Sequence, residues 1–189
     1  MKLTNREKIF LLEIVRETIR MWLSGNGFRH EPDIQSIISI DRPMALENVG
    51  GFVTLKKDGN VIISKGGHST GYPLYLLVRD LAIETVISNK IKFNEINDID
   101  IEISVLTPLK KITSVEEEFF YGQHGIYMEK DGKFATLLPQ ETNSGWTQDE
   151  FLNHCASRME PKSDWIDWKT ANLFIFETII FNEKDFGLK

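Results

Sequence analysis

The stretch Gly51-Phe52-Val53-Thr54-Leu55-Lys56-Lys57-Asp58-Gly59-Asn60-Val61-Ile62-Ile63-Ser64 decides the fold class. It places an Asp-Gly pair between two apolar runs rich in β-branched residues, which is a strong short-range signal for a β-hairpin. A second Asp-Gly pair, at residues 131–132, lies between runs 125–129 and 134–138 of similar character. The sequence therefore predicts two antiparallel hairpins.

Helical segments are interspersed with these hairpins. Capping-box patterns at residues 4–7 and 147–150 each precede an apolar run with helical spacing. Pro73 suits the first position of a further helix that ends near Asn89. Because helices and hairpins do not alternate as regular βαβ units, the order of elements favours an α+β fold. We expect a central, mainly antiparallel sheet with hairpins, flanking helices and a smaller lobe.

Two more strands complete the prediction. Residues 99–105 alternate strictly between apolar and other residues, which predicts a half-buried strand with its acidic side chains on the solvated face. Residues 172–181 are rich in Phe and Ile and predict one final strand. We expect a single domain over residues 1–189, with the smaller lobe formed by segments around 28–48 and 140–168.

Composition limits the classes of function. The chain has 189 residues, a net charge of −6 and one cysteine, Cys155. Nucleic-acid-binding domains usually carry a basic patch, so the acidic excess argues against that role. A single cysteine cannot form an internal disulfide, and no apolar run is long enough to span a bilayer. We therefore expect a soluble, cytoplasmic protein that binds neither membrane nor nucleic acid.

Motifs for metals and cofactors are missing. The four histidines form no HExxH or HxxxH pair, and Cys155 has no CxxC partner. Residues 66–71 are Gly-rich and precede a helix, but they lack the lysine and the spacing of a P-loop. No GxSxG elbow is present. We expect no metal and no cofactor.

Two polar residues stand out as candidates for a site. His124 lies between Gly122 and Gly125, which let the backbone turn sharply, and histidine titrates near neutral pH. It either fixes its own turn or acts as an acid or base. Gln140 follows a Leu-Pro pair that ends a strand, and it either caps backbone groups or binds a ligand.

Several segments together resemble the AMMECR family, the "A" component of AmmeMemoRadiSam systems. Residues 51–59 are similar to the family's GAFVTLKKxG hairpin, and residues 100–108 match its DIEISVLTP strand. Residues 122–125 match its GxHG, and residues 137–140 match its LLPQ. The resemblance implies a mixed α+β domain with a smaller lobe. It also implies partners, since prokaryotic members are associated with a Memo-like protein and a radical SAM protein.

One family motif departs from its pattern. The family hexamer reads Leu-Arg-Gly-Cys-Ile-Gly, whereas residues 61–66 read Val-Ile-Ile-Ser-Lys-Gly. Ile62 stands in place of the arginine and Ser64 in place of the cysteine, and Gly66 is retained. Serine is a weaker nucleophile than cysteine unless a base activates it. Loss of the arginine removes a bidentate anion binder. Chemistry that depends on the hexamer is therefore lost or altered.

Two functions from different classes follow. The first is an accessory or interaction domain that acts with a Memo-like or radical SAM partner, favoured because few reactive groups remain. The second is a small-ligand-binding protein or enzyme with a cleft at Ser64, His124 and Gln140. In that hypothesis His124 and Ser64 are the candidate catalytic residues, and Gln140, Lys65 and Gly66 are the candidate ligand-binding residues. The sequence leaves open whether the protein is an enzyme.

Overall fold

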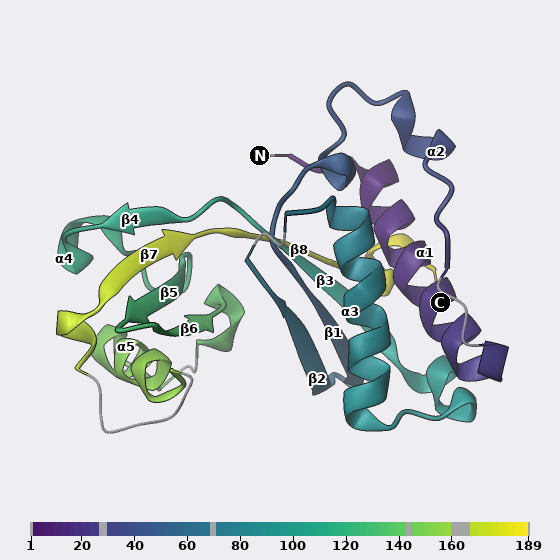
Figure 1. Ribbon diagram of the computed structural model, residues 1–189. Coiled ribbons are helices and arrows are strands. Elements are labelled where there is room, and N and C mark those ends of the chain that lie inside the picture. The colour runs from purple at the N-terminus through teal and green to yellow at the C-terminus, as the bar shows by residue number, and fades with distance from the viewer. Residues whose placement is uncertain (1, 27–29, 69–70, 143–144, 160–166, 189) are drawn as a thin grey trace. The chain divides into compact units, whose positions relative to one another are not determined.

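The chain forms two compact units, each with its own sheet (Figure 1). A computed structural model describes residues 2–26, 30–68, 71–142, 145–159 and 167–188. Unit 1 comprises Met1–Leu106 and Ile179–Lys189, and unit 2 comprises Thr107–Thr178. The α+β fold class is confirmed, and its antiparallel strands are shared between two four-stranded sheets. That residues 1–189 act as one domain with a small lobe stays a prediction.

Sheet A, in unit 1, has the strand order β2-β1-β3-β8. Its strands are β1 (Gly51–Lys57), β2 (Asn60–Gly67), β3 (Asp100–Leu106) and β8 (Thr178–Asn182). β1 pairs antiparallel with both β2 and β3. The first hairpin is confirmed, with Asp58 at φ 52° and Gly59 at φ 80° in its turn. Two successive positive φ angles are what a two-residue hairpin turn requires.

Two helices cover one face of sheet A, and they lie side by side in Figure 1. These are α1 (Asn5–Met21) and α3 (Leu74–Asn89). The capping box that opens α1 is confirmed, since Thr4 Oγ1 accepts from the backbone N–H of Glu7. Alternate residues of β1 and β3, among them Val53, Leu55 and Ile103, are buried in the same cluster as the helices. That cluster is the core of unit 1.

Shorter elements complete unit 1: η1 (Trp22–Asn26), α2 (Gln35–Ile38), η2 (Met44–Leu46), η3 (Phe93–Asp98) and η6 (Glu183–Phe186). η6 carries Glu183, which accepts hydrogen bonds from the Arg16 guanidinium and from the backbone N–H of Ile101. Arg16 also donates to the carbonyls of Ile96 and Ile99. This buried network ties α1, η3, β3 and η6 together.

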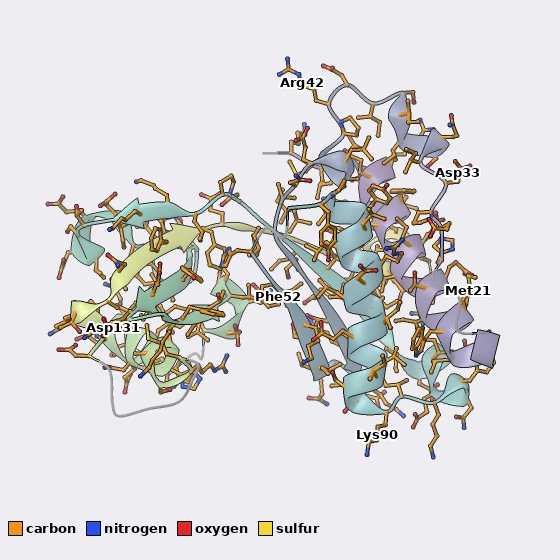
Figure 2. The ribbon with its side chains drawn as sticks, viewed as in Figure 1. Met21, Asp33, Arg42, Phe52, Lys90 and Asp131 are labelled. Atoms are coloured by element: carbon orange, nitrogen blue, oxygen red, sulfur yellow. The ribbon has the colours of Figure 1, made fainter. Side chains whose placement is uncertain are left out.

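Sheet B, in unit 2, has the strand order β4-β7-β5-β6. Its strands are β4 (Lys110–Ile112), β5 (Gly125–Lys130), β6 (Lys133–Leu137) and β7 (Asn172–Phe176). The second hairpin is confirmed, with Asp131 at φ 51° and Gly132 at φ 75°. Figure 2 labels Asp131 at this turn. β7 pairs antiparallel with both β4 and β5, and β5 pairs antiparallel with β6.

One helix covers one face of sheet B. This helix, α5 (Gln148–Ser157), begins with the predicted capping box of Thr147 and Glu150. Its Phe151, Leu152 and Cys155 are fully buried together with residues from β5, β6 and β7. The remaining elements of the unit are α4 (Val115–Glu118), η4 (Pro139–Glu141) and η5 (Trp168–Thr170).

The structure corrects two details of the predicted strands. Residues 172–181 form two strands, β7 and β8, which belong to different sheets and are separated at Glu177. The strand predicted at 99–105 is buried on both faces, because Ser104 is inaccessible and Glu102 is only 9% exposed. Glu102 tolerates burial because it pairs with Lys56 Nζ at 2.6 Å.

Candidate functional site

The predicted site residues are divided between the two units. Ser64, Lys65 and Gly66 lie in unit 1, whereas His124 and Gln140 lie in unit 2. The hypothesis that Ser64, His124 and Gln140 line one cleft therefore stays a prediction.

Ser64 is an exposed residue on the face of sheet A that points away from α1 and α3. Its hydroxyl lies 2.8 Å from Thr54 Oγ1 on the neighbouring strand. Thr54 in turn lies opposite Glu102, whose carboxylate pairs with Lys56. We call these four residues the polar face of sheet A. Within the described residues, Ser64 has no histidine, lysine or carboxylate as an activating base, so its hydroxyl serves as a cross-strand hydrogen-bonding group.

Gly66 and Lys65 have roles in packing and pairing. A Cβ on Gly66 would lie 2.2 Å from the Gly51 carbonyl oxygen and 2.6 Å from Cγ of Phe52, a side chain labelled in Figure 2, so the retained glycine makes room for the neighbouring strand and for that ring. Lys65 points to the opposite face, where its Nζ lies 3.3 Å from Glu84 Oε1 of α3. Gly66 also lines a cavity of about 260 Å³ together with residues of α3 such as Asp80.

His68 follows the end of β2 and is half-buried. Burial lowers the pKa of its imidazole from 6.5 to about 4. Desolvation disfavours the charged form of a histidine, which is the physical cause of this direction. His68 is therefore neutral at physiological pH, and it is a residue that the sequence reading did not select.

His124 closes its own turn in unit 2. Its Nδ1 accepts a hydrogen bond from the backbone N–H of Phe120 at 3.2 Å, and the backbone N–H of His124 donates to the Phe120 carbonyl at 3.0 Å. Because Nδ1 is the acceptor, the proton of the neutral imidazole is assigned to Nε2. Gly122 has φ 83°, which suits glycine in the turn. A Cβ on Gly125 would collide with the Phe176 ring and lie 2.9 Å from the Leu137 carbonyl oxygen.

His124 also lines a cavity of about 480 Å³ within unit 2. We call it the Phe120 pocket; its lining includes Lys110, Glu117, Glu118, Phe120, His124 and Glu177. Its volume is in the range that holds small ligands. Glu118 pairs with Lys110 Nζ at 2.9 Å. Hydrogen bonds from the Thr113 backbone and from Lys110 lower the pKa of Glu118 to about 2, so its carboxylate is ionised.

Gln140 is exposed in η4, the short 3-10 turn after β6. The residues before it, Leu138 and Pro139, are buried. Glu141 fixes the turn, because its carboxylate accepts from the Leu138 backbone N–H at 2.8 Å and from Arg158 at 2.6 Å. Gln140 is not among the residues that line the Phe120 pocket.

Two other kinds of chemistry have no ready site in the described residues. Cys155 is inaccessible in α5, and burial raises the pKa of its thiol far above the usual value. Within the described ranges, no three His, Cys, Asp or Glu side chains lie close enough to hold a metal ion. No described helix has the length and apolarity needed to cross a membrane.

Comparison with known proteins assigns the chain to a family. Its sequence matches the model of the AMMECR1 family over residues 12–181. The chain belongs to the AMMECR1 family. Among its AMMECR1-family relatives, Protein MK0488 of Methanopyrus kandleri is 30% identical over 199 residues, covering 97% of this chain and 92% of the relative. A protein of Methanothermobacter thermautotrophicus is 32% identical over 186 residues, covering 92% of each chain.

A solved structure shares the fold of this AMMECR1-family chain. It is the crystal structure of the uncharacterized protein PH0010 from Pyrococcus horikoshii, with a TM-score of 0.82 and 27% identity. The match covers 97% of this chain and 95% of that one. The names of these relatives state no reaction and no partner, so the function of the AMMECR1-family protein has to be argued from its own residues.

The sequence reading missed an exposed aromatic surface in the AMMECR1-family chain. Tyr127, Phe134 and Phe174 lie on the face of sheet B opposite α5, since the residues that alternate with them are buried against that helix. Lys111 of β4 lies over the Phe174 ring. We call these four residues the aromatic face. Their period-two alternation with buried neighbours was a sequence signal for a shared face, but the strand order that joins them was not readable.

Proposed function

We propose that this protein is a binding domain that acts with a Memo-like or radical SAM protein as its partner, and that it performs no chemistry of its own. The observation that carries the proposal is the aromatic face of sheet B. Aromatic side chains with one exposed surface are enriched in protein interfaces, where they supply large contact areas. The partner classes come from the family resemblance.

The aromatic face is arranged as a continuous row. Phe134 is 56% exposed and stacks on Tyr127 with ring centroids 6.2 Å apart. Tyr127 meets Phe174 edge-on at 5.8 Å. Lys111 Nζ lies 5.9 Å from the Phe174 centroid and 3.0 Å from Asn172 Oδ1. The row is therefore held in place before a partner arrives, which lowers the entropic cost of binding.

The reactive side chains support the non-enzymatic reading. Ser64 is hydrogen-bonded to Thr54, His124 uses Nδ1 to close its turn, and Cys155 is inaccessible. A catalytic nucleophile needs an adjacent base or a lowered pKa. Within the part of the chain that the structure describes, neither is found at Ser64 or Cys155.

The direct test is a binding titration against a purified Memo-like protein and a purified radical SAM protein. We expect one of them to bind, and Phe134→Ala to weaken that binding by at least about tenfold, as for an interfacial hot spot. Phe93→Ala is the matched control, because Phe93 is 55% exposed but lies in unit 1. Equal affinity of Phe134→Ala and Phe93→Ala, or no binding to either protein, would remove the proposal.

The proposal includes the setting in which the protein works. A cytoplasmic location agrees with a lone, unpaired cysteine. The net charge of −6 supports the view that nucleic acid is not its partner. A filter-binding assay with DNA and RNA at low salt tests the second point, and salt-sensitive binding at micromolar protein would contradict it.

A second candidate is a small-ligand-binding protein or enzyme with Ser64, His124 and Gln140 at its site. The specific observation in its favour is that His124 lines a cavity of about 480 Å³. A ligand screen followed by His124→Ala tests this candidate. Ligands that bind wild type and His124→Ala equally would exclude His124 from the site.

A further inference from the structure

The Phe120 pocket has a lining whose charges do not cancel. Its titratable residues include three glutamates and one lysine. Lys110 is committed to Glu118 at 2.9 Å, so that pair is neutral as a unit. Glu117 and Glu177 remain, and neither side chain forms an ion pair among the described residues. The pocket therefore carries an excess of two negative charges.

The two remaining carboxylates come from different elements. Glu117 belongs to α4, whereas Glu177 lies in the connection that follows β7. The position of Glu177 is fixed by its backbone, because its N–H donates to Thr107 Oγ1 at 2.8 Å and its carbonyl accepts from the Thr107 N–H at 2.9 Å. A cleft lined by charges of one sign concentrates the opposite ion.

The pocket also offers apolar and aromatic surface. Phe120 is 55% exposed, and Ile175 and Phe176 line the same cavity. Phe120 is held in place by His124, whose ring meets it edge-on with centroids 5.4 Å apart. An exposed aromatic ring beside carboxylates attracts organic cations, since its face carries negative charge density. A hydrated metal ion would make no use of this apolar surface.

We propose that the Phe120 pocket binds an organic cation, namely an amine or guanidine compound with an apolar or aromatic body. Its cationic group lies between Glu117 and Glu177, and its body lies against the exposed ring of Phe120. This site is separate from the aromatic face, and it gives the cavity lined by His124 a ligand class. His124 contributes packing and turn geometry to it and performs no proton transfer.

The test is a titration of isotope-labelled protein with benzamidine, followed by NMR. We expect amide shifts concentrated at residues 117–124 and 175–177, with an affinity in the millimolar range or tighter. The neutral isostere benzamide should bind several-fold more weakly, and benzoate should not bind. Equal binding of benzamidine and benzamide would overturn the charge argument, and shifts elsewhere on the chain would overturn the location.

Variants separate the two parts of the site. Glu117→Gln/Glu177→Gln should weaken benzamidine binding by about tenfold, on the scale of two exposed ion pairs. Glu129→Gln, an exposed carboxylate of β5 that does not line the pocket, is the control and should change nothing. Phe120→Leu should weaken benzamidine binding a few-fold, because leucine keeps the apolar volume but lacks the aromatic ring that attracts a cation. Unchanged affinity in both test variants would remove the proposal.

The source of the cation is resolved by two further ligands. Agmatine represents a free guanidine compound, and N-acetyl-arginine-N-methylamide represents an arginine side chain of a peptide. Tighter binding of agmatine indicates a free small molecule, and tighter binding of the capped arginine indicates a peptide segment; failure of both to bind would contradict the proposal. None of these titrations needs a Memo-like or radical SAM protein, so their outcome is independent of the partner test.

Discussion

Sheet A and sheet B have the same construction but opposite outer chemistry. Both have four strands and one face covered by helix, two helices on sheet A and one on sheet B. On the other face sheet A carries its polar face, where the hydroxyls of Ser64 and Thr54 pair with each other and the carboxylate of Glu102 pairs with Lys56. Sheet B carries the aromatic row Phe134, Tyr127 and Phe174. The inner faces form the core of each unit, so the two units differ mainly in the chemistry of their other faces.

The family motifs divide along the same line. The hexamer that departs from the family pattern lies in β2 of sheet A, whereas the GxHG and LLPQ motifs lie in unit 2. In unit 2, Gly125 gives room to Phe176 and His124 supports Phe120, so both motif residues shape the Phe120 pocket. Both of the proposed binding surfaces therefore lie in unit 2.

The largest expected effect concerns the charges inside unit 1. Glu183→Ala leaves Arg16 as a buried, partly unpaired cation and leaves the Ile101 N–H without its acceptor. Glu183 is 2% exposed, so we expect a loss of about 3–5 kcal/mol in unfolding free energy. Urea unfolding followed by circular dichroism measures it. The matched change in unit 2, Arg158→Ala, removes an exposed pair with Glu141 and should cost less than about 1 kcal/mol.

A similar loss in both variants would break the comparison, because it would mean that unit 2 also depends on an ion pair. A double variant, Arg16→Met with Glu183→Leu, provides a check on the mechanism. Replacing both partners removes the unpaired charge, so the double variant should recover much of the stability lost in Glu183→Ala.

The next effect concerns glycines in the two sheets. Gly125→Ala forces its Cβ into the Phe176 ring, and overpacking of this kind costs about 1–3 kcal/mol. Gly67→Ala in sheet A is the matched control, because a Cβ there meets no atom within 4 Å. Thermal unfolding of both variants gives the comparison. Equal melting temperatures would show that Phe176 can move aside, and the shape of the Phe120 pocket would then not depend on Gly125.

The two units should also lose stability in different pH ranges. The pKa of His68 is lowered from 6.5 to about 4, so the unfolded chain binds a proton that the folded chain does not between these values. Unit 1 therefore loses stability as pH falls from 6.5 to 4. A pKa shift of one unit corresponds to about 1.4 kcal/mol, so the largest possible loss of unfolding free energy is about 3 kcal/mol. Because His68 is partly exposed, we expect a loss of about 1–2 kcal/mol.

Glu118 in unit 2 responds at lower pH. Its pKa is lowered from 4.5 to about 2, so its contribution is present above pH 4.5 and is lost as pH falls through 2. Urea titrations at pH 7, 5 and 4 measure the unfolding free energy across the range in which His68 acts. His68→Gln should flatten the pH dependence between 6.5 and 4, and an unchanged slope in that variant would contradict the assignment to His68.

Local signals predicted much of this fold. Both Asp-Gly turns and the capping boxes at Thr4 and Thr147 are present as expected, because each depends on residues within four positions of one another. The division of residues 172–181 at Glu177 was not predictable in the same way. Apolar composition is similar on both sides of it, and the break follows from pairing with strands more than 40 residues away in sequence.

The candidate site was harder to predict than the fold. His124 was found because the nearby glycines signal a sharp turn. In the structure Gly122 has a positive φ, and Gly125 leaves space for the Phe176 ring. Glu117, Phe120 and Glu177 were missed because they are ordinary residue types without a spacing pattern. They line one cavity through the pairing of β7 with β4 and β5, which no short sequence window contains.

The smallest expected effect is a change at Ser64, and it tests whether the polar face of sheet A is open. Ser64→Cys restores the thiol of the family hexamer at an exposed position, and it should alter unfolding free energy by less than about 1 kcal/mol. Folded wild type should be unreactive toward a disulfide reagent, because Cys155 is inaccessible and burial raises its thiol pKa.

Ser64→Cys should instead release one equivalent of chromophore from the folded protein, with Ser64→Ala as the control for the lost hydrogen bond to Thr54. A reactive thiol at this position would mean that the natural serine has replaced a usable nucleophile at an accessible place. The change from cysteine to serine would then be enough to explain the loss of a nucleophile, which favours a binding role for the protein. A thiol that reacts no faster than wild type would mean that the polar face is covered, and the contrast between the two outer faces would have to be abandoned.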